Sequence, residues 1–218
     1  MNGAPDFRIL GHAGLALGRP PCVVVVDPWR GNGAGLGASA ALVTHGHADH
    51  CSEEDLHEST LRSAPIVCPQ NVAARLGRAF PGRVVGLAEG STWTAPGVSV
   101  RALPAQGPAR AAGFHPRGEG LSYLVESGGA RYLVLGASDA LPEHAHSAPD
   151  VAFVAVGDFT VMTPEEAAEA AARIAPRLAV PVHWGDTSAR FSAAQRFVDL
   201  CAARGVAADA VGDRARAL

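Results

Sequence analysis

Three histidines and one aspartate follow one another closely in a short segment of the chain. The segment reads THGHADH over residues 44–50 and supplies four side chains: His45, His47, Asp49 and His50. Neutral imidazole and carboxylate groups are ligands that suit zinc, with manganese or iron as alternatives. A surface histidine cluster needs no particular neighbour, whereas this segment directly follows an apolar run at 41–44 that predicts a buried strand. The position after a buried strand therefore favours a metal site.

Other catalytic motifs are absent from the sequence. The glycine-rich segment 31–37 lacks the Lys-Ser/Thr ending of a phosphate-binding loop. The sequence also contains no Gly-x-Ser-x-Gly motif of a serine hydrolase. Cys51 directly follows the histidine motif, and we interpret it as a small buried apolar residue and not as a soft metal ligand. Three further histidines in polar context are predicted to lie on the surface: His57, His144 and His146.

Composition narrows the class of protein. The 218 residues carry 18 basic and 21 acidic side chains, a formal net charge of −3, and 48% of them are hydrophobic. This hydrophobic content excludes a disordered chain, and the mildly acidic balance without basic runs argues against nucleic-acid or membrane-surface binding. The 4 cysteines form no Cys-x-x-Cys pair and are expected to be free thiols. We find no targeting signal and no apolar stretch of membrane-spanning length, so we expect a cytoplasmic protein.

The segments that must position the histidine motif alternate between strands and helices. Short apolar, β-branched runs predict strands at 23–27, 41–44, 66–68, 98–103, 121–126, 132–135, 151–156 and 179–182. Helices are expected at 71–80, 164–175 and 192–203, and Thr163 is a suitable N-cap for the second of them. The long segment 104–120 has no such pattern, and loops of that length tend to be functional. No composition shift marks a boundary, so we predict one α/β domain over residues 1–218.

The histidine motif resembles the H-x-H-x-D-H signature of the metallo-β-lactamase superfamily. Further segments are similar to motifs of its small cytoplasmic metal-dependent hydrolase branch, which includes the ascorbate-phosphate lactonase-like proteins. They are LGHAG at 10–14, VDPW at 26–29, FHP at 114–116, TPEEA at 163–167 and HWGD at 183–186. Several matches in the right order over most of the chain are more specific than the histidine motif alone. The chain is thus similar to the cytoplasmic branch and not to an exported β-lactamase.

The resemblance implies an α/β fold of a particular kind, a four-layer αββα sandwich with a metal centre at one edge of its two sheets. The ligands that it assigns form two sets: His45, His47 and His115 for one ion, and Asp49, His50 and His183 for the other. Zinc is the expected metal, with Mn(2+) or Fe(2+) as alternatives. We expect activity to depend on Asp49 and His183. Asp49 acts either as a metal ligand or, if the second site is empty, as a general base.

One departure from the family pattern concerns the carboxylate that bridges two metal ions. The family carries Gly-Asp-Thr after a strand, whereas this chain reads LGASD at 135–139 and places Ala137 at the bridging position. A methyl group cannot bind a metal, so we expect loss of the bridge and one or two bound ions. Asp139 lies two residues on, where a small shift would let it substitute. Three other residues are candidates for contacts to the ligands or the substrate: His12, Asp27 and Asp186.

These features predict a metal-dependent hydrolase that directs an activated water at a lactone, amide or phosphoester of a small molecule. Three arginines in or beside the two long loops hint at an anionic substrate: Arg30, Arg110 and Arg117. Two alternatives stay open. One is a mononuclear enzyme with redox, lyase or isomerase chemistry, and the other is a degenerate member that binds a partner without catalysis. The sequence carries no signal for an oligomeric state.

Overall fold

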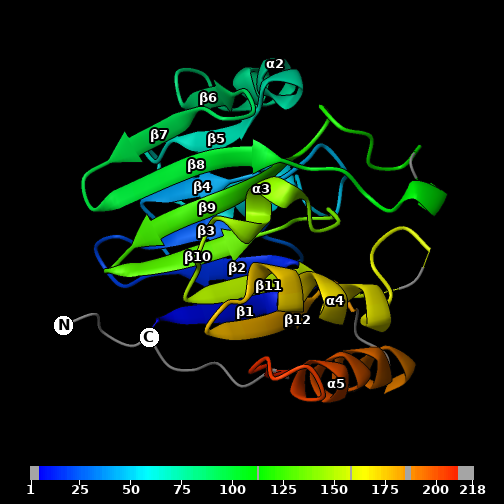
Figure 1. Cartoon of the computed structure of the whole chain (residues 1–218). Helices are drawn as coiled ribbons and strands as arrows, with labels where there is room; N and C mark the ends of the chain where they lie inside the picture. The colour runs from blue at the N-terminus through cyan, green and yellow to red at the C-terminus, as the bar shows by residue number, and fades with distance from the viewer. Residues whose placement is uncertain (1–4, 112, 158, 185–187, 211–218) are drawn as a thin grey trace.

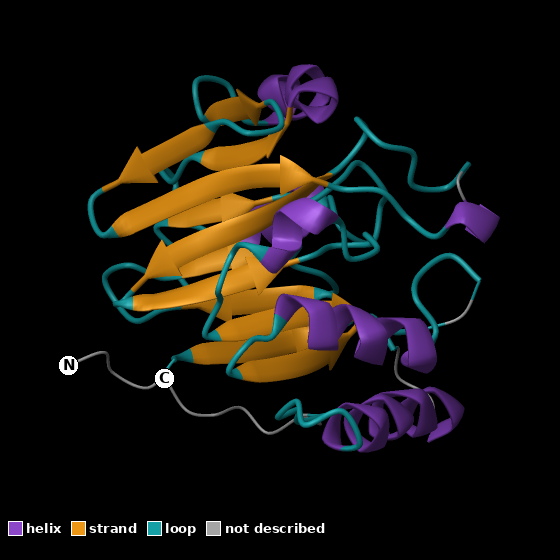
Figure 2. Cartoon of the chain, in the orientation of Figure 1, coloured by secondary structure: helices purple, strands orange, loops and turns teal. Residues whose placement is uncertain are grey.

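Two six-stranded sheets packed face to face form the centre of the molecule (Figures 1 and 2). The computed structural model describes residues 5–111, 113–157, 159–184 and 188–210, without the side chains of 188–191. The first sheet runs in the order β1 (Phe7–Gly11), β2 (Gly14–Leu17), β3 (Val24–Val26), β4 (Ala40–Leu42), β5 (Ile66–Pro69) and β6 (Val84–Leu87). The second runs in the order β12 (Leu178–Val182), β11 (Val151–Ala155), β10 (Ala130–Val134), β9 (Leu121–Ser127), β8 (Val98–Pro104) and β7 (Thr92–Ala95).

Helices cover the outer faces of both sheets (Figure 2). On the first sheet lie α1 (Glu53–Ser59) and α2 (Gln70–Ala79). On the second lie α3 (Pro142–Ala145), α4 (Pro164–Ile174) and α5 (Ser188–Ala202), and a short 3₁₀ helix (Ala109–Ala111) interrupts the long loop after β8. As predicted, Thr163 caps α4: its hydroxyl accepts from the Glu166 N–H, and the Glu166 carboxylate accepts from the Thr163 N–H.

Three apolar clusters separate the four layers. The central cluster lies between the sheets and contains Tyr123 and Phe153. The other two clusters lie between each sheet and its own helices. In β10, Tyr132 and Val134 enter the central cluster while Leu133 faces α4 and α5, as the alternation of side chains along a strand requires. The structure therefore confirms the αββα sandwich.

The carboxyl ends of the parallel strands meet at one edge of this sandwich. Strands β3 to β6 pair in parallel in the first sheet, and β10 to β12 do so in the second. Parallel neighbours end on the same side, so the loops that follow them lie together. The Tyr123 hydroxyl of β9 donates to the Val43 carbonyl over 2.9 Å, which ties the second sheet to the end of β4. The histidine motif follows β4 at this edge.

The structure contains every strand that the sequence predicts, with small shifts at the ends. Four strands lie outside the predicted set: β1, β2, β6 and β7. The predicted helices correspond to α2, α4 and α5, although α5 begins at Ser188 and not at residue 192. Helices α1 and α3 were not expected.

Candidate metal centre

Two neighbouring clusters of metal-ligand side chains lie at this edge. The first cluster contains His45, His47 and His115. The second contains His12, Asp49, His50 and His183. Within each cluster, one donor atom of every residue lies within 4.8 Å of the others. The structure thus brings together the residues that the resemblance assigns to two ions, in the same two sets. It also adds His12 to the second set, whereas the sequence makes it a candidate for a contact to the ligands or the substrate.

The first cluster joins the end of β4 to the long loop after β8. His45 Nε2 lies 3.1 Å from His47 Nδ1. The ring centroid of His115 lies 5.0 Å from that of His45 and 4.9 Å from that of His47. A Cβ atom on Gly107 would come within 2.9 Å of the Cβ of His115, so the loop needs glycine there to bring His115 to the strand end.

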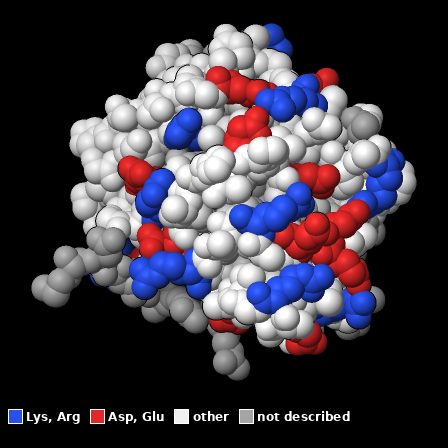
Figure 3. Space-filling view, in the orientation of Figure 1, with Lys and Arg blue, Asp and Glu red and all other residues white. Residues whose placement is uncertain are grey.

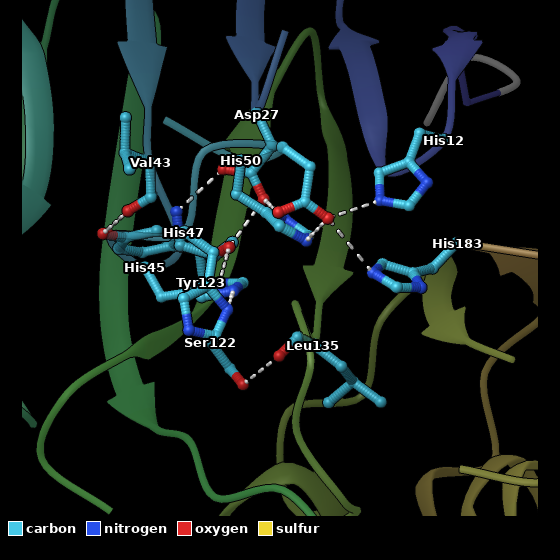
Figure 4. A network of polar contacts seen from close by, with 12 residues as sticks. His12, Asp27, Val43, His45, His47, His50, Ser122, Tyr123, Leu135 and His183 are labelled. Atoms are coloured by element: carbon cyan, nitrogen blue, oxygen red, sulfur yellow. Dashed lines mark hydrogen bonds and ion pairs between the residues drawn. The ribbon is translucent and has the colours of Figure 1, made fainter. Parts of the chain in front are cut away.

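The second cluster has a single carboxylate oxygen at its centre (Figure 4). Asp49 Oδ2 lies 2.9 Å from Nε2 of His12, 3.6 Å from that of His50 and 3.8 Å from that of His183. Asp49 and His50 occupy a turn that ends before Ser52, the N-cap of α1, so the helix begins later than the motif. This turn folds the second half of the motif back towards the end of β12.

Asp27 holds the motif in place from the end of β3. Its Oδ1 accepts from the Thr44 backbone N–H over 2.8 Å, and its Oδ2 accepts from the Thr44 hydroxyl over 2.6 Å. The same Oδ2 lies 2.8 Å from His50 Nδ1. Because the Thr44 proton points to Asp27, the Thr44 oxygen is the acceptor for His45 Nδ1, 3.0 Å away. An acceptor at Nδ1 leaves Nε2 with the lone pair that a metal needs.

The donor atoms fit a metal ion. His50 is 1% exposed, and its Nε2 has no hydrogen-bond partner among the described residues. An unpaired buried polar atom costs about 1–3 kcal/mol, which an ion at that point would offset. His115 Nδ1 lies 3.1 Å from the Thr160 carbonyl, so its Nε2 also carries a free lone pair.

Burial keeps three of the imidazoles neutral, those of His45, His115 and His183. Burial lowers the pKa of His45 far below its usual range, and the neighbouring histidines lower it further. Burial also lowers the pKa of His115 to about 4 and that of His183 to about 3. The hydrogen bond from His12 is the main cause that lowers the pKa of the Asp49 carboxyl. At neutral pH these side chains therefore have the protonation states that metal binding requires.

Ala137, which the resemblance places at the position of the family's bridging carboxylate, lies beside the first cluster. Its side chain is 7% exposed and packs with Ala155 and Val161. The same residue lines the pocket that reaches His45 and His115. A methyl group, which offers no donor atom, therefore lines the pocket beside the first cluster.

Asp139 belongs to neither cluster among the described residues. Its backbone N–H donates to the Gln106 carbonyl over 2.8 Å. Burial is the main cause that raises the pKa of its carboxyl, and the charge of Glu166 adds to it. The structure therefore offers no support for Asp139 as a replacement bridge. Asp186, the other acidic residue considered, lies outside the described residues.

A pocket of about 230 Å³ opens beside the first cluster. Its lining contains apolar and polar groups in addition to the three histidines: Thr44, Gly46, Asn71, Ala105, Gln106, Phe114, Pro116, Glu119, Gly120, Leu121 and Ala137. Most of these belong to the long loop, which supports the expectation that it is functional. Among the described residues of this lining, Glu119 is the one Asp, Glu, Lys or Arg side chain.

The three arginines considered for substrate binding have contacts elsewhere. Arg110 pairs with Glu166 over 2.5 Å, and Arg117 lies 3.1 and 3.3 Å from Glu89 and Glu143. The Arg30 guanidinium lies over the ring of the preceding tryptophan, 5.8 Å from its centroid. On the face shown in Figure 3, basic and acidic side chains are interspersed over the described residues, with no broad basic patch.

His144 corrects one prediction, because it is buried and not on the surface. Its Nδ1 accepts from the Leu141 N–H over 3.0 Å, and its Nε2 donates to the Pro104 carbonyl over 3.0 Å. The exposed side chains of His57 and His146 agree with the prediction. Cys51 is buried, and all four cysteines are free, as expected.

Several known proteins are similar to this chain in sequence and fold. The model of the β-lactamase superfamily domain matches residues 24–184. A UPF0173 metal-dependent hydrolase from Thermococcus kodakarensis is 30% identical over 191 residues, which cover 81% of this chain and 83% of that protein. A crystal structure of a proposed metal-dependent hydrolase from Parabacteroides distasonis has a TM-score of 0.80 and 25% identity, covering 92% of this chain and 90% of that one.

A more distant structural match is the diiron β-hydroxylase CmlA from Streptomyces venezuelae. Its TM-score is 0.76 at 16% identity, over 95% of this chain and 53% of that one, so it shares the fold alone. In the described part of this chain, no helix combines the length and apolar character needed to cross a bilayer.

Proposed function

Because the chain belongs to the metallo-β-lactamase superfamily, we propose that it is a metal-dependent hydrolase with its active site at the two ligand clusters. One observation carries the proposal: loops from both sheets bring seven potential ligands together in two neighbouring clusters, the first of which lines a pocket. Residues 1–218 form one domain in this proposal, and the protein acts in the cytoplasm. Zinc is the preferred metal because neutral imidazole nitrogens dominate the donor set.

Each of the two clusters would bind one metal ion. His45, His47 and His115 would hold one ion, and Asp49, His50 and His183 would hold the other. A bound divalent ion would polarise the substrate oxygen and lower the pKa of water from about 16 to roughly 7. Activity depends on Asp49 and His183 because three imidazoles, His183 among them, are arranged around Asp49 Oδ2. This crowded oxygen favours a ligand role for Asp49 over a general base.

The pocket favours a small uncharged carbonyl compound, such as a lactone, ester or amide. Glu119 would repel an anion, and Arg110 and Arg117 are paired with carboxylates. Phe114 and Leu121 supply apolar surface, while Gln106 offers an amide for a polar substituent. These features support a carboxylic ester or amide over a phosphoester, whose charge would face an acidic side chain.

A direct assay tests this function. Metal-free protein is reloaded with Zn²⁺ or Mn²⁺ and given 4-nitrophenyl acetate, a set of lactones and 4-nitrophenyl phosphate. We expect hydrolysis of the uncharged substrates, at least about a hundredfold slower in His47→Ala, because a first-cluster ligand is lost. His146→Ala serves as the control, since that exposed histidine lies outside both clusters. Metal-loaded protein that hydrolyses none of these substrates would contradict the proposal.

The alternative is a mononuclear enzyme with redox, lyase or isomerase chemistry. Ala137 is the observation that favours it, because a missing bridge weakens the coupling between two ions. Iron in protein purified without added metal, together with oxygen-dependent turnover, would support this alternative. A degenerate binding protein is less consistent with ligands whose Nε2 lone pairs are left free.

A further inference from the structure

The two clusters differ in the number of donors that they offer. The first has three imidazoles, and the second has three imidazoles and a carboxylate. The extra member of the second cluster is His12. Three protein ligands with an open position are typical of catalytic zinc, whereas four ligands are typical of a closed structural site. Whether His12 binds the second ion therefore decides which of the two ions keeps an open position for a substrate.

The backbone holds His12 towards the second cluster. His12 lies in the two-residue turn between β1 and β2, with a left-handed φ of +51°. His183, at the end of β12, also has a left-handed φ, of +67°. The His183 N–H donates to the His12 carbonyl over 2.8 Å, and the two rings lie 4.1 Å apart. A left-handed non-glycine residue is strained and persists where its surroundings require it.

The distances around Asp49 fit four ligands of one ion. Zinc bonds of about 2.1 Å in a tetrahedron place neighbouring donor atoms roughly 3.4 Å apart. The three Nε2 atoms lie 2.9, 3.6 and 3.8 Å from Asp49 Oδ2, close to that spacing. His12 Nε2 donates to the Asp49 carboxylate, so binding an ion through Nε2 would move that proton to Nδ1 or into solvent.

The pocket reaches only the first cluster. His45, His47 and His115 line it, and no member of the second cluster does among the described residues. Ala137 also lines it and supplies no donor atom. A molecule in the pocket therefore meets the three-histidine set and lies away from Asp49 and His12.

We propose that His12 is a fourth metal ligand and that the two sites are unequal. The second cluster forms a closed four-ligand site that binds its ion first and more tightly. The first cluster holds its ion with three histidines and keeps an open position towards the pocket. This division of roles rests on the metal centre of the proposed function and adds to it.

Metal binding can be followed without any turnover. Metal-free protein is titrated with Co²⁺, and the visible absorption and the bound metal per chain are recorded for each variant. We expect the wild type to bind in two steps, the first with the strong absorption of a four-coordinate site. His12→Gln retains an amide that can donate to Asp49 but is a poor metal ligand. We expect it to weaken the first step by about tenfold or more and to change its absorption.

A second variant tests the other cluster, and melting of the metal-free proteins checks that each variant folds. His115→Gln should abolish the second step and leave the first at wild-type affinity. His146→Ala, an exposed histidine, is the control for both. A wild-type first step in His12→Gln would show that His12 only positions Asp49, and loss of the first step in His115→Gln would show that the first cluster is the tight site. Either result overturns the proposal, whereas failure to hydrolyse any substrate would overturn only the proposed function.

Discussion

Asp27 Oδ2 lies 2.8 Å from His50 Nδ1, and both side chains are only 1% exposed. The aspartate also accepts two hydrogen bonds from Thr44, so one buried carboxylate fixes both ends of the histidine motif. It has a left-handed φ of +43°, a conformation that asparagine also tolerates. The Asp27 carboxylate therefore organises the site from the end of β3, a strand that contributes no proposed ligand.

Asp27→Asn should weaken the site without breaking the backbone turn. The amide oxygen cannot accept all three hydrogen bonds, and the amide N–H₂ would face a donor. We expect the free energy of unfolding to fall by about 1–3 kcal/mol. Metal affinity should fall about 10- to 100-fold, as is usual when an outer partner of a ligand is lost. Chemical denaturation and Zn²⁺ titration measure both effects, with Asp199→Asn, an exposed residue of α5, as the control. Wild-type affinity in Asp27→Asn would exclude this organising role.

Ala137→Asp should restore a carboxylate beside the first cluster. The residue is buried against Ala155 and Val161, so an unpaired charge there should lower the melting temperature of the metal-free protein. Bound metal should offset that loss and should rise towards two ions per chain. Melting with and without Zn²⁺ measures the difference. Ala137→Asn, of the same size but uncharged, should show a smaller rise in melting temperature on addition of Zn²⁺. Equal gains in the two variants would mean that the carboxylate does not reach an ion.

The fold was predictable where periodicity is strong. Strand β11 consists of apolar residues alone, and β9 is apolar at most of its buried positions, so their burial shows in the sequence. Strand β7, in contrast, alternates between exposed and half-buried residues and contains no fully buried one. Strand β6 is mostly half-buried. Such edge strands depend on pairing with distant partners, which local patterns do not encode.

The grouping of the candidate ligand side chains into two clusters was predictable from motifs, but the place of His12 was not. Its approach to Asp49 depends on the short β1–β2 turn and on a backbone hydrogen bond to His183, far away in sequence. His144 shows the opposite error. Its polar neighbours suggest a surface position, but α3 packs against β8 and covers the ring. In both cases, tertiary contacts decide what a lone histidine does.

His144 should stabilise the fold without contributing to metal binding. His144→Leu leaves the Leu141 N–H and the Pro104 carbonyl without their partner, so we expect a loss of about 1–3 kcal/mol in the free energy of unfolding. Metal content should stay at the wild-type level. His146→Ala, two residues on and exposed, is the control. Loss of metal in His144→Leu would show that this region supports the site.

The same residue should make stability depend on pH. Burial lowers the pKa of His144, although the Pro104 carbonyl and the Glu143 charge act in the opposite direction. Below about pH 6.5 the unfolded chain therefore binds a proton at His144 that the folded chain does not. The stabilisation that the neutral, buried ring provides is lost as the pH falls below this value. One proton contributes at most about 1.4 kcal/mol per pH unit. The stability difference between wild type and His144→Leu should shrink from pH 7.5 to pH 5. A constant difference would contradict neutral burial of the ring.

Glu119→Arg should change which substrates the pocket accepts. The side chain lines the pocket and is exposed, and Asn71 contacts only its backbone carbonyl, so the substitution should leave the loop intact. Reversing the charge should raise kcat/KM for an ester with a distal carboxylate relative to its uncharged analogue. We expect about a fivefold to tenfold change, mostly in KM and smaller at high salt, because an exposed charge interaction is worth about 1 kcal/mol. Glu58→Arg, at an exposed residue of α1, controls for net charge. An unchanged ratio in Glu119→Arg would mean that substrates bind away from this pocket.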